Sequence, residues 1–283
     1  REGNQRTTPD FRRRIVGNLL LGMEVRSVKI PQAKIEERAI STLRNIIDKH
    51  PTMNPDFDSM DKKMSWDGFI WIFTGETEQS KDAYDDKVSV QIKGHIDREN
   101  KYFSKEKITY PVEVADLKVY FKGTGTIYFL VFMTEDGKKR EIYYASLFPS
   151  KIKRYLQRVE EKMLTKTISI PFRRLKQTPE DFYIVVKQFS IECKKQGFGD
   201  GPIVQNTIEQ KEIEEVDTIT AVVVGASTDL EICQRMETGD VCIYGKTKNG
   251  KIARPLEWND DAAKTFREKM ERAVEIKRTV DYI

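Results

Sequence analysis

The sequence is poor in the residues that build disulfide frameworks, thiolate metal sites and histidine-based catalysis. Its 283 residues include 3 cysteines and 2 histidines. Cys193, Cys233 and Cys242 are scattered without a CxxC pair, which argues against disulfides and a zinc-thiolate site and favours a reducing, cytoplasmic location. Metal chemistry would have to use carboxylates, which favours Mg²⁺ or Mn²⁺ over zinc.

Long apolar runs and a strong net charge are also absent. No stretch of 18 apolar residues occurs, so we expect no membrane span, and no signal peptide is visible at the start. The formal net charge is +4, from 49 basic and 45 acidic residues. That balance is too mild to identify a nucleic-acid-binding protein, so the local distribution of charge has to decide.

Hydrophobic periodicity predicts an α/β unit over residues 31–164. The predicted order is a helix, three strands, a helix, two strands and a helix, with a polar loop over residues 51–66 after the first helix. The predicted helices cover residues 33–50, 113–121 and 150–164, and the predicted strands cover 69–73, 88–92, 107–112, 127–133 and 140–145.

Residues 165–283 predict a second, smaller α+β unit that serves as an accessory or partner-binding domain. A strand over 167–172 precedes a helix over 178–196, and residues 199–215 are polar and predicted as loop. Further on we expect a strand over 219–224, a hairpin formed by 241–247 and 251–258, and a charged helix over 259–279. Residues 1–30 form a basic N-terminal arm, which is either a solvated tail or an arm that contacts phosphates.

The chemistry-bearing residues cluster in the first unit. Asp67 begins an apolar strand, and Gln91 and Lys93 end the next strand two residues apart, on one face. A hairpin between these strands would bring Asp67 beside them. A carboxylate and a second oxygen ligand can hold Mg²⁺ against a phosphodiester, and a neighbouring lysine can stabilise the developing negative charge. Glu36, on the apolar stripe of the first helix, could provide a further ligand.

At these residues the sequence resembles the PD-(D/E)XK, or restriction-endonuclease-like, nuclease superfamily, and more narrowly its Mrr-like branch at the N-termini of bacterial defence proteins. The similarity covers roughly residues 31–160 and includes the order of helix, three strands, helix and strand. It is carried by Glu36-x-x-Ala39, Trp66-Asp67-Gly68, Val90-Gln91-Ile92-Lys93-Gly94, Ile127-Tyr128-Phe129-Leu130-Val131, and Tyr143-Tyr144-Ala145 with Leu147.

The resemblance implies a PD-(D/E)XK-like mixed sheet flanked by helices, a metal-dependent nuclease acting on DNA or RNA, and a role as an antiviral defence effector. It makes Asp67 the metal-binding aspartate, Lys93 the catalytic lysine and Glu36 the helix glutamate. Gln91 stands where most members have Asp or Glu, so the metal site is one negative charge short. A regulatory partner subunit or an attached sensing module is the further partner that the resemblance implies.

Several features also have a purely structural interpretation. A catalytically degenerate protein that binds nucleic acid, or acts as a scaffold, is the alternative to an active nuclease. His95 is predicted to lie in a loop, Trp66 and Trp71 in the core, and Gly123-Thr124-Gly125 in a turn. A basic run around the predicted domain junction is either ordinary surface or a groove that follows phosphates; it comprises Lys151, Lys153, Arg154, Arg158, Arg173, Arg174 and Lys176.

Overall fold

The computed structural model describes most of the first 196 residues and four short strands beyond them. The described residues are 30–57, 65–75, 79–163, 166–196, 206–208, 216–222, 242–248 and 252–255. The predicted basic arm, apart from Ile30, and the helix predicted over 259–279 lie outside these residues.

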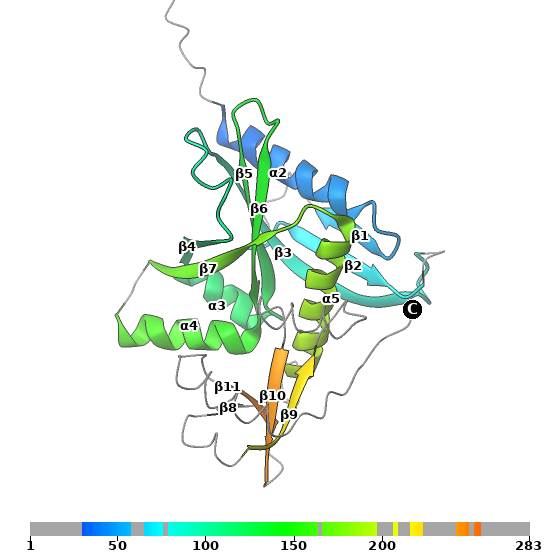
Figure 1. The fold of residues 1–283 in the computed structure, drawn as a ribbon, viewed down its shortest axis with the longest axis vertical. Helices are drawn as coiled ribbons and strands as arrows, with labels where there is room; N and C mark the ends of the chain where they lie inside the picture. Colours follow the sequence, from blue (N-terminus) through cyan, green and yellow to red (C-terminus); the bar gives the residue numbers. More distant parts are fainter. Residues whose placement is uncertain are drawn as a thin grey trace, which may run out of the picture. The chain divides into compact units, whose positions relative to one another are not determined.

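The centre of the molecule is a seven-stranded mixed sheet flanked by helices, which agrees with the predicted α/β class (Figure 1). The strands lie in the order β1-β2-β3-β5-β6-β7-β4, and β3 and β5 are its parallel pair. The strands are β1 (Met53–Phe57), β2 (Gly68–Phe73), β3 (Tyr84–Ile96), β4 (Lys107–Glu113), β5 (Thr126–Met133), β6 (Arg140–Leu147) and β7 (Thr167–Leu175). The helices are α2 (Gln32–Ile47), α3 (Val114–Lys122), α4 (Pro149–Glu161) and α5 (Pro179–Gln196).

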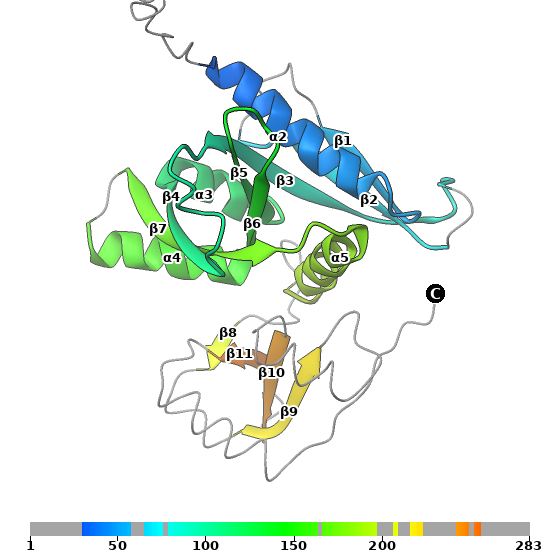
Figure 2. The ribbon, with the colours of Figure 1, turned by 45° about the horizontal axis from the view of Figure 1, so that its top comes forward.

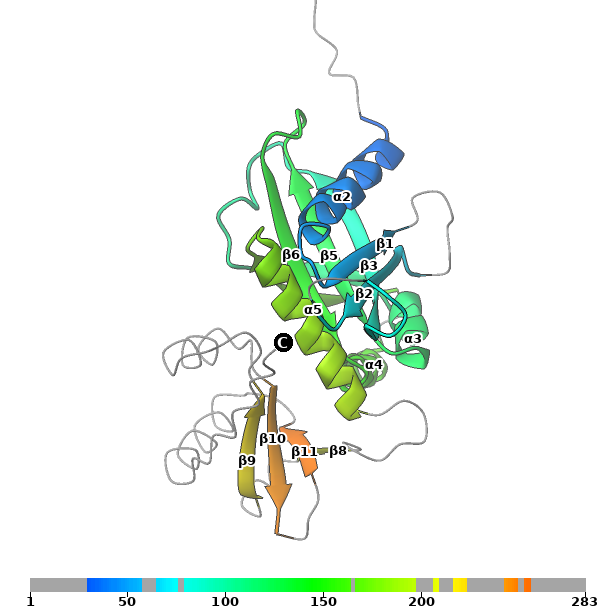
Figure 3. The same cartoon turned by 90° about the vertical axis from the view of Figure 1, so that its right-hand side faces the viewer.

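The helices form two layers on the sheet. Burial alternates along most of β7 but is complete along β5, the central strand, which is covered on both faces. Helices α3 and α4 pack together on one face, and α2 lies away from them (Figures 2 and 3). Helix α5 contacts α4 at the start of α4, where Phe148 stacks on Phe189. The ring of Phe182 on α5 stacks on Phe129 of β5, on the face opposite Tyr128. Among the described residues, no helix is long and apolar enough to cross a membrane.

Two helix starts follow directly from local sequence. Pro149 occupies the first turn of α4, where a missing backbone N–H costs nothing. Before α5, the Thr178 hydroxyl accepts the N–H of Asp181 at 3.1 Å and donates to the Asp181 carboxylate. This reciprocal cap satisfies a backbone donor at the helix start and fixes where α5 begins.

The loop predicted over residues 51–66 is wrong in its first part, because Met53–Phe57 forms the edge strand β1. Its side chains alternate between buried and exposed, with Met53 and Phe57 facing inward. Pro55 argues against a strand when only the sequence is considered, because proline is rare inside sheets. A proline is tolerated at the sheet edge, where its missing N–H removes no ladder hydrogen bond.

Strand β7, which lies beyond the predicted boundary at residue 164, belongs to the main sheet. β7 pairs antiparallel with β6 on one side and with β4 on the other. The third predicted strand is present as β4, but it lies at the far edge of the sheet and not beside β3. Since α5 also packs against β3, residues 167–196 are part of the same layered unit.

A second, four-stranded sheet has the order β8-β11-β10-β9. The predicted hairpin is confirmed by the antiparallel pairing of β10 (Cys242–Thr247) with β11 (Ile252–Pro255). The strand predicted over 219–224 is β9 (Val216–Val222). The loop predicted over 199–215 contains one short strand, β8 (Asn206–Ile208), which pairs parallel with β11.

Candidate active site

Asp67 lies immediately before β2, in backbone contact with β3. Its N–H donates to the carbonyl of Val90 at 3.0 Å, and Gly68 is paired with Val90 in the ladder. Gly68 has a φ of 146°, and a Cβ there would lie 2.2 Å from the carbonyl oxygen of Asp56. Only glycine fits this approach, so Gly68 fixes the position at which the Asp67 side chain leaves the strand.

The Asp67 carboxylate is tied to β3 by two hydrogen bonds on one oxygen. Oδ2 accepts the side-chain amide of Gln91 at 2.5 Å and the backbone N–H of Ile92 at 2.6 Å. Among the described residues, no hydrogen bond reaches Oδ1. Burial raises the pKa of Asp67, and the Ile92 N–H and the nearby Lys93 only partly offset it. Asp67 is therefore a carboxylate held in place but left with an open oxygen.

Gln91 connects Asp67 to α3. Its side chain is 4% exposed, its Nε2 donates to Asp67, and its Oε1 accepts the hydroxyl of Tyr120 at 3.3 Å. Tyr120 is fully buried, and burial raises its pKa strongly, so its hydroxyl remains a hydrogen-bond donor. The amide thus satisfies both neighbours at once, which a carboxylate at this position could not do.

Lys93 shares the face of β3 with Gln91, as the two-residue spacing predicts. Its side chain is half-buried, and its charge lowers the pKa of Asp67. In the part of the chain that the structure describes, its ammonium makes no hydrogen bond or ion pair. An ammonium that is partly desolvated and unpaired beside a carboxylate is suited to bind an anion.

Glu36 approaches from α2, which lies directly on β3. A Cβ on Gly94 would be 2.7 Å from the carbonyl oxygen of Ile35 and 3.0 Å from Cβ of Ala39, so the glycine lets the helix settle there. The charge of Glu36 raises the pKa of Asp67 and opposes the lowering of the pKa of His95. The predicted four residues therefore lie in one electrostatic neighbourhood, with Glu36 half-buried at its border.

His95 does not lie in a loop, as predicted, but inside β3 on the face of Gln91 and Lys93. Its ring lies between Phe132 of β5 and Tyr110 of β4, at centroid distances of 5.2 and 5.3 Å. Burial lowers its pKa, and Lys93 lowers it further. Its Nε2 is buried and has no hydrogen-bond partner. The contact with Tyr110 also shows that the sheet curls until edge strand β4 approaches β3.

Trp66 borders the other side of the site, where it is half-buried and packs against the core. Its ring lies 6.0 Å from that of Tyr120, and its Nε1 is buried without a hydrogen-bond partner. Sequence patterns missed Tyr120 as a site residue because a tyrosine on an apolar helix face looks like core alone. Its distinguishing signal is a hydroxyl that must find a partner when buried.

Part of the basic run near the predicted junction forms ion pairs with acidic side chains of the protein. Arg174 donates to Glu141 at 2.8 Å and to Glu106 at 3.2 Å, and these bonds raise its pKa. On α4, Lys153 is exposed, and Arg154 and Arg158 are half-buried. Arg174 therefore braces β7 against its neighbours and is not available as a phosphate ligand.

The donor set fits a divalent metal only with help from a ligand. Asp67 offers the open Oδ1, whereas Gln91 turns its Nε2 toward Asp67 and its carbonyl oxygen toward Tyr120. The described residues contain no group of three or more His, Cys, Asp or Glu side chains that could hold a metal. Mg²⁺ typically keeps several waters and is bound by one or two carboxylates plus substrate phosphate. Asp67 alone supplies one such carboxylate, and α2, which carries Glu36, packs against the Gly94 face of β3, opposite Gln91 and Lys93.

The sequence matches no family model, and no curated protein or solved structure is similar to the chain. What the site can do is therefore inferred from its own geometry.

Proposed function

We propose that the protein is a metal-dependent nuclease that hydrolyses phosphodiester bonds in DNA or RNA. The observation that carries the proposal is the joining of Asp67, Gln91 and Lys93 on one face of adjacent strands, with the Asp67 Oδ1 and the Lys93 ammonium both available. The succession of α2, the antiparallel strands β1-β2-β3, and then, after edge strand β4, helix α3 and strand β5 parallel to β3 supports a PD-(D/E)XK-like fold for this unit.

The roles follow from the residues. Asp67, Gln91 and Glu36 would hold Mg²⁺ or Mn²⁺, which polarises the scissile phosphate and lowers the pKa of a bound water. Lys93 stabilises the negative charge that develops on the phosphate oxygens as water adds and the P–O bond to the leaving strand breaks. Because Gln91 directs its Nε2 to Asp67 and its Oε1 to Tyr120, metal binding would require the Gln91 amide to turn its oxygen toward Asp67.

The wider roles rest on the resemblance at Glu36, Asp67, Gln91 and Lys93. We propose an antiviral defence effector, located in the cytoplasm, whose activity is controlled by a regulatory partner subunit or an attached sensing module. The scarcity of cysteines supports the location.

A cleavage assay tests the proposed activity. Plasmid, single-stranded DNA and RNA are incubated with the protein and Mg²⁺ or Mn²⁺, with and without EDTA. We expect EDTA to abolish cleavage and Lys93→Ala to lower it by about 100-fold or more. Lys87→Ala is the matched control, since Lys87 lies on the same strand but packs over Phe69 at 4.5 Å. Cleavage that survives both EDTA and Lys93→Ala would overturn the proposal.

A binding-only protein is the second candidate, and the Gln91 amide favours it. Because Gln91 pairs with both Asp67 and Tyr120, the site is satisfied without a metal. This candidate predicts nucleic-acid binding that EDTA leaves unchanged and no cleavage with either metal.

A further inference from the structure

Two adjoining clefts lie at the carboxyl ends of the parallel strands β3 and β5. One, of about 950 Å³, is lined by Phe103, Gly137, Arg140 and Gln177 together with three residues of the β5–β6 turn. The other, of about 560 Å³, includes Asp97 and Arg98 after β3. The turn residues Asp136, Lys138 and Lys139 line both. The carboxyl ends of parallel strands are where open α/β sheets usually bind ligands.

The acidic groups of these clefts are engaged in local bonds. Asp97 is 6% exposed and accepts the backbone N–H groups of Lys101 and Tyr102. Glu135 pairs with Arg98 at 2.7 Å. Asp136 accepts from the Thr134 hydroxyl and from the N–H of Lys138, and both bonds lower its pKa.

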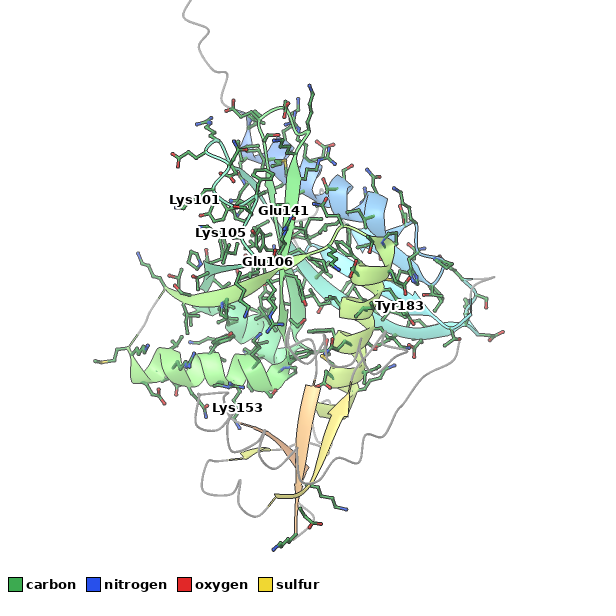
Figure 4. All side chains as sticks on the ribbon, viewed as in Figure 1. Lys101, Lys105, Glu106, Glu141, Lys153 and Tyr183 are labelled. Carbon is green, nitrogen blue, oxygen red and sulfur yellow. The ribbon has the colours of Figure 1, made fainter. Side chains whose placement is uncertain are left out.

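The basic side chains of the same surface are left exposed. Lys138 lies 3.9 Å from Asp136 yet keeps 84% of its side chain in solvent. Lys139 is exposed, and within the described residues its ammonium has no ion pair. Lys101 and Lys105, labelled in Figure 4, extend the surface along the loop between β3 and β4 and lie over the ring of Tyr102. These exposed lysines are the groups of the surface that can contact an anion from solvent.

Phe103 adds an aromatic surface inside the larger cleft. It is half-buried, and no other aromatic ring in the described part of the chain stacks on it. A positively charged groove that contains a free aromatic face is the combination used to bind single-stranded nucleic acid, because every base has a face that can stack. A duplex keeps its bases stacked on one another and cannot use such a ring.

The smaller cleft begins just beyond the end of β3, the strand that carries Gln91 and Lys93. Asp97 follows Lys93 by four residues, or about 13 Å at the rise of an extended strand. A strand of a few nucleotides spans that distance. We propose that these clefts bind single-stranded nucleic acid, with a base stacked on Phe103 and phosphates bound by Lys138 and Lys139. The inference rests on the proposed nuclease function and names its substrate as single-stranded.

Fluorescence anisotropy tests the proposal, using labelled oligo-dT, oligo-U and a mixed-sequence duplex in EDTA with the Lys93→Ala protein. We expect both single strands to bind more tightly than the duplex. Phe103→Ala should weaken single-strand binding about tenfold, and Phe103→Trp should restore it. Lys138→Ala/Lys139→Ala should weaken binding and reduce the salt dependence by roughly 0.7 per lost phosphate contact.

Lys153→Ala/Lys162→Ala removes the same charge from the competing basic surface, where Lys153 on α4 and Lys162 just after it are both exposed. Circular dichroism of each variant confirms that it is folded. The proposal is overturned if the α4 pair weakens binding as much as the turn pair, if Phe103→Ala binds like its parent, or if the duplex binds best. These results leave EDTA-sensitive cleavage by wild type, and with it the proposed function, standing. Absence of cleavage and of binding by wild type removes both.

Discussion

Strand β3 carries an acid–base cluster at each end, and the two are built in opposite ways. Near its start, Asp85 accepts from Lys187 at 2.7 Å and from Lys194 at 3.0 Å, and Asp86 accepts from the Ser190 hydroxyl. Burial would raise the pKa of Asp85, but these bonds outweigh it and lower the pKa. Near the other end, burial wins at Asp67 and its pKa is raised.

The two clusters differ because the first is built to stabilise the fold, whereas the second leaves charged groups without an ion pair among the described residues. At the first end both lysines reach their carboxylates and fasten α5 to β3. At the second end Lys93 forms no hydrogen bond with Asp67. The neutral side-chain amide of Gln91 donates to the Asp67 carboxylate instead. Charges that are held but unpaired cost stability and are typical of sites that bind a charged ligand.

Replacing the lysine by alanine at each end of β3 in turn should give the largest difference in stability between two variants. Lys187→Ala leaves Asp85 buried with one fewer donor and should lower the free energy of unfolding by about 2 kcal/mol at pH 7. Lys93→Ala breaks no bond within the described residues and should change it by less than about 0.5 kcal/mol. Urea denaturation measures both, and equal losses would contradict the distinction.

The Lys187→Ala loss should also depend on pH. Because the pKa of Asp85 is lowered in the folded state, its stabilisation is present above the ordinary aspartate pKa and is lost as the pH falls through the folded value. The difference between wild type and Lys187→Ala should therefore shrink in acid, and a difference that is constant with pH would argue against the pairing.

Gln91→Glu should turn the site into one that needs a metal. The new carboxylate cannot donate to Asp67, so in EDTA the two acids repel and the free energy of unfolding should fall by about 1–2 kcal/mol. Mn²⁺ should reverse this loss and bind more tightly than to wild type, as measured by calorimetry and thermal melts. Unchanged metal affinity, together with unchanged Mg²⁺ dependence of cleavage, would remove Gln91 from the site.

Asp67→Asn should make the protein more stable at neutral pH while removing cleavage. The amide oxygen can still accept the Ile92 N–H, and no charge is buried. Since the wild-type pKa is raised, wild type loses stability as the pH rises from the ordinary aspartate value through the folded one. The advantage of the variant should be constant above that window and vanish below it; urea titrations at pH 3 and pH 7 separate the two regimes.

His95→Phe should give the smallest effect. Phenylalanine keeps the stacking on Phe132 and Tyr110 but removes the buried Nε2 that has no partner. We expect the free energy of unfolding to rise by roughly 0.5–1 kcal/mol. A decrease in stability would mean that Nε2 is hydrogen-bonded in solution, for example to a buried water.

The convergence of Asp67, Gln91 and Lys93 could be predicted because it depends on local rules. Side chains two apart share a strand face, and a hairpin brings neighbouring strands together. The length of β3 could not be predicted, because Gly94 and polar neighbours interrupt the apolar alternation near its end. Nor could the place of β4, since no local pattern states which distant strand an edge strand will pair with.

The role of Tyr120 and the lack of an ion pair at Lys93 within the described residues could not be predicted from the sequence, for another reason. Both depend on what lies across a packed interface: α3 supplies a hydroxyl to Gln91, and among the described residues no carboxylate forms an ion pair with Lys93. Charge and residue type can be read from a sequence, but which charges are left unpaired is decided by packing.

The pairing of β4 with β7 has a consequence for how the chain folds. β4 leaves the ribosome before α3, β5, β6 and α4, yet its ladder partner comes only after all of them. Contacts between segments so distant in sequence close slowly, because the entropy of the intervening loop is lost before they form. We expect a nascent chain to assemble β1, β2, β3, β5 and β6 first and to keep the apolar face of β4 uncovered until β7 arrives, an interval in which a chaperone would have most to protect.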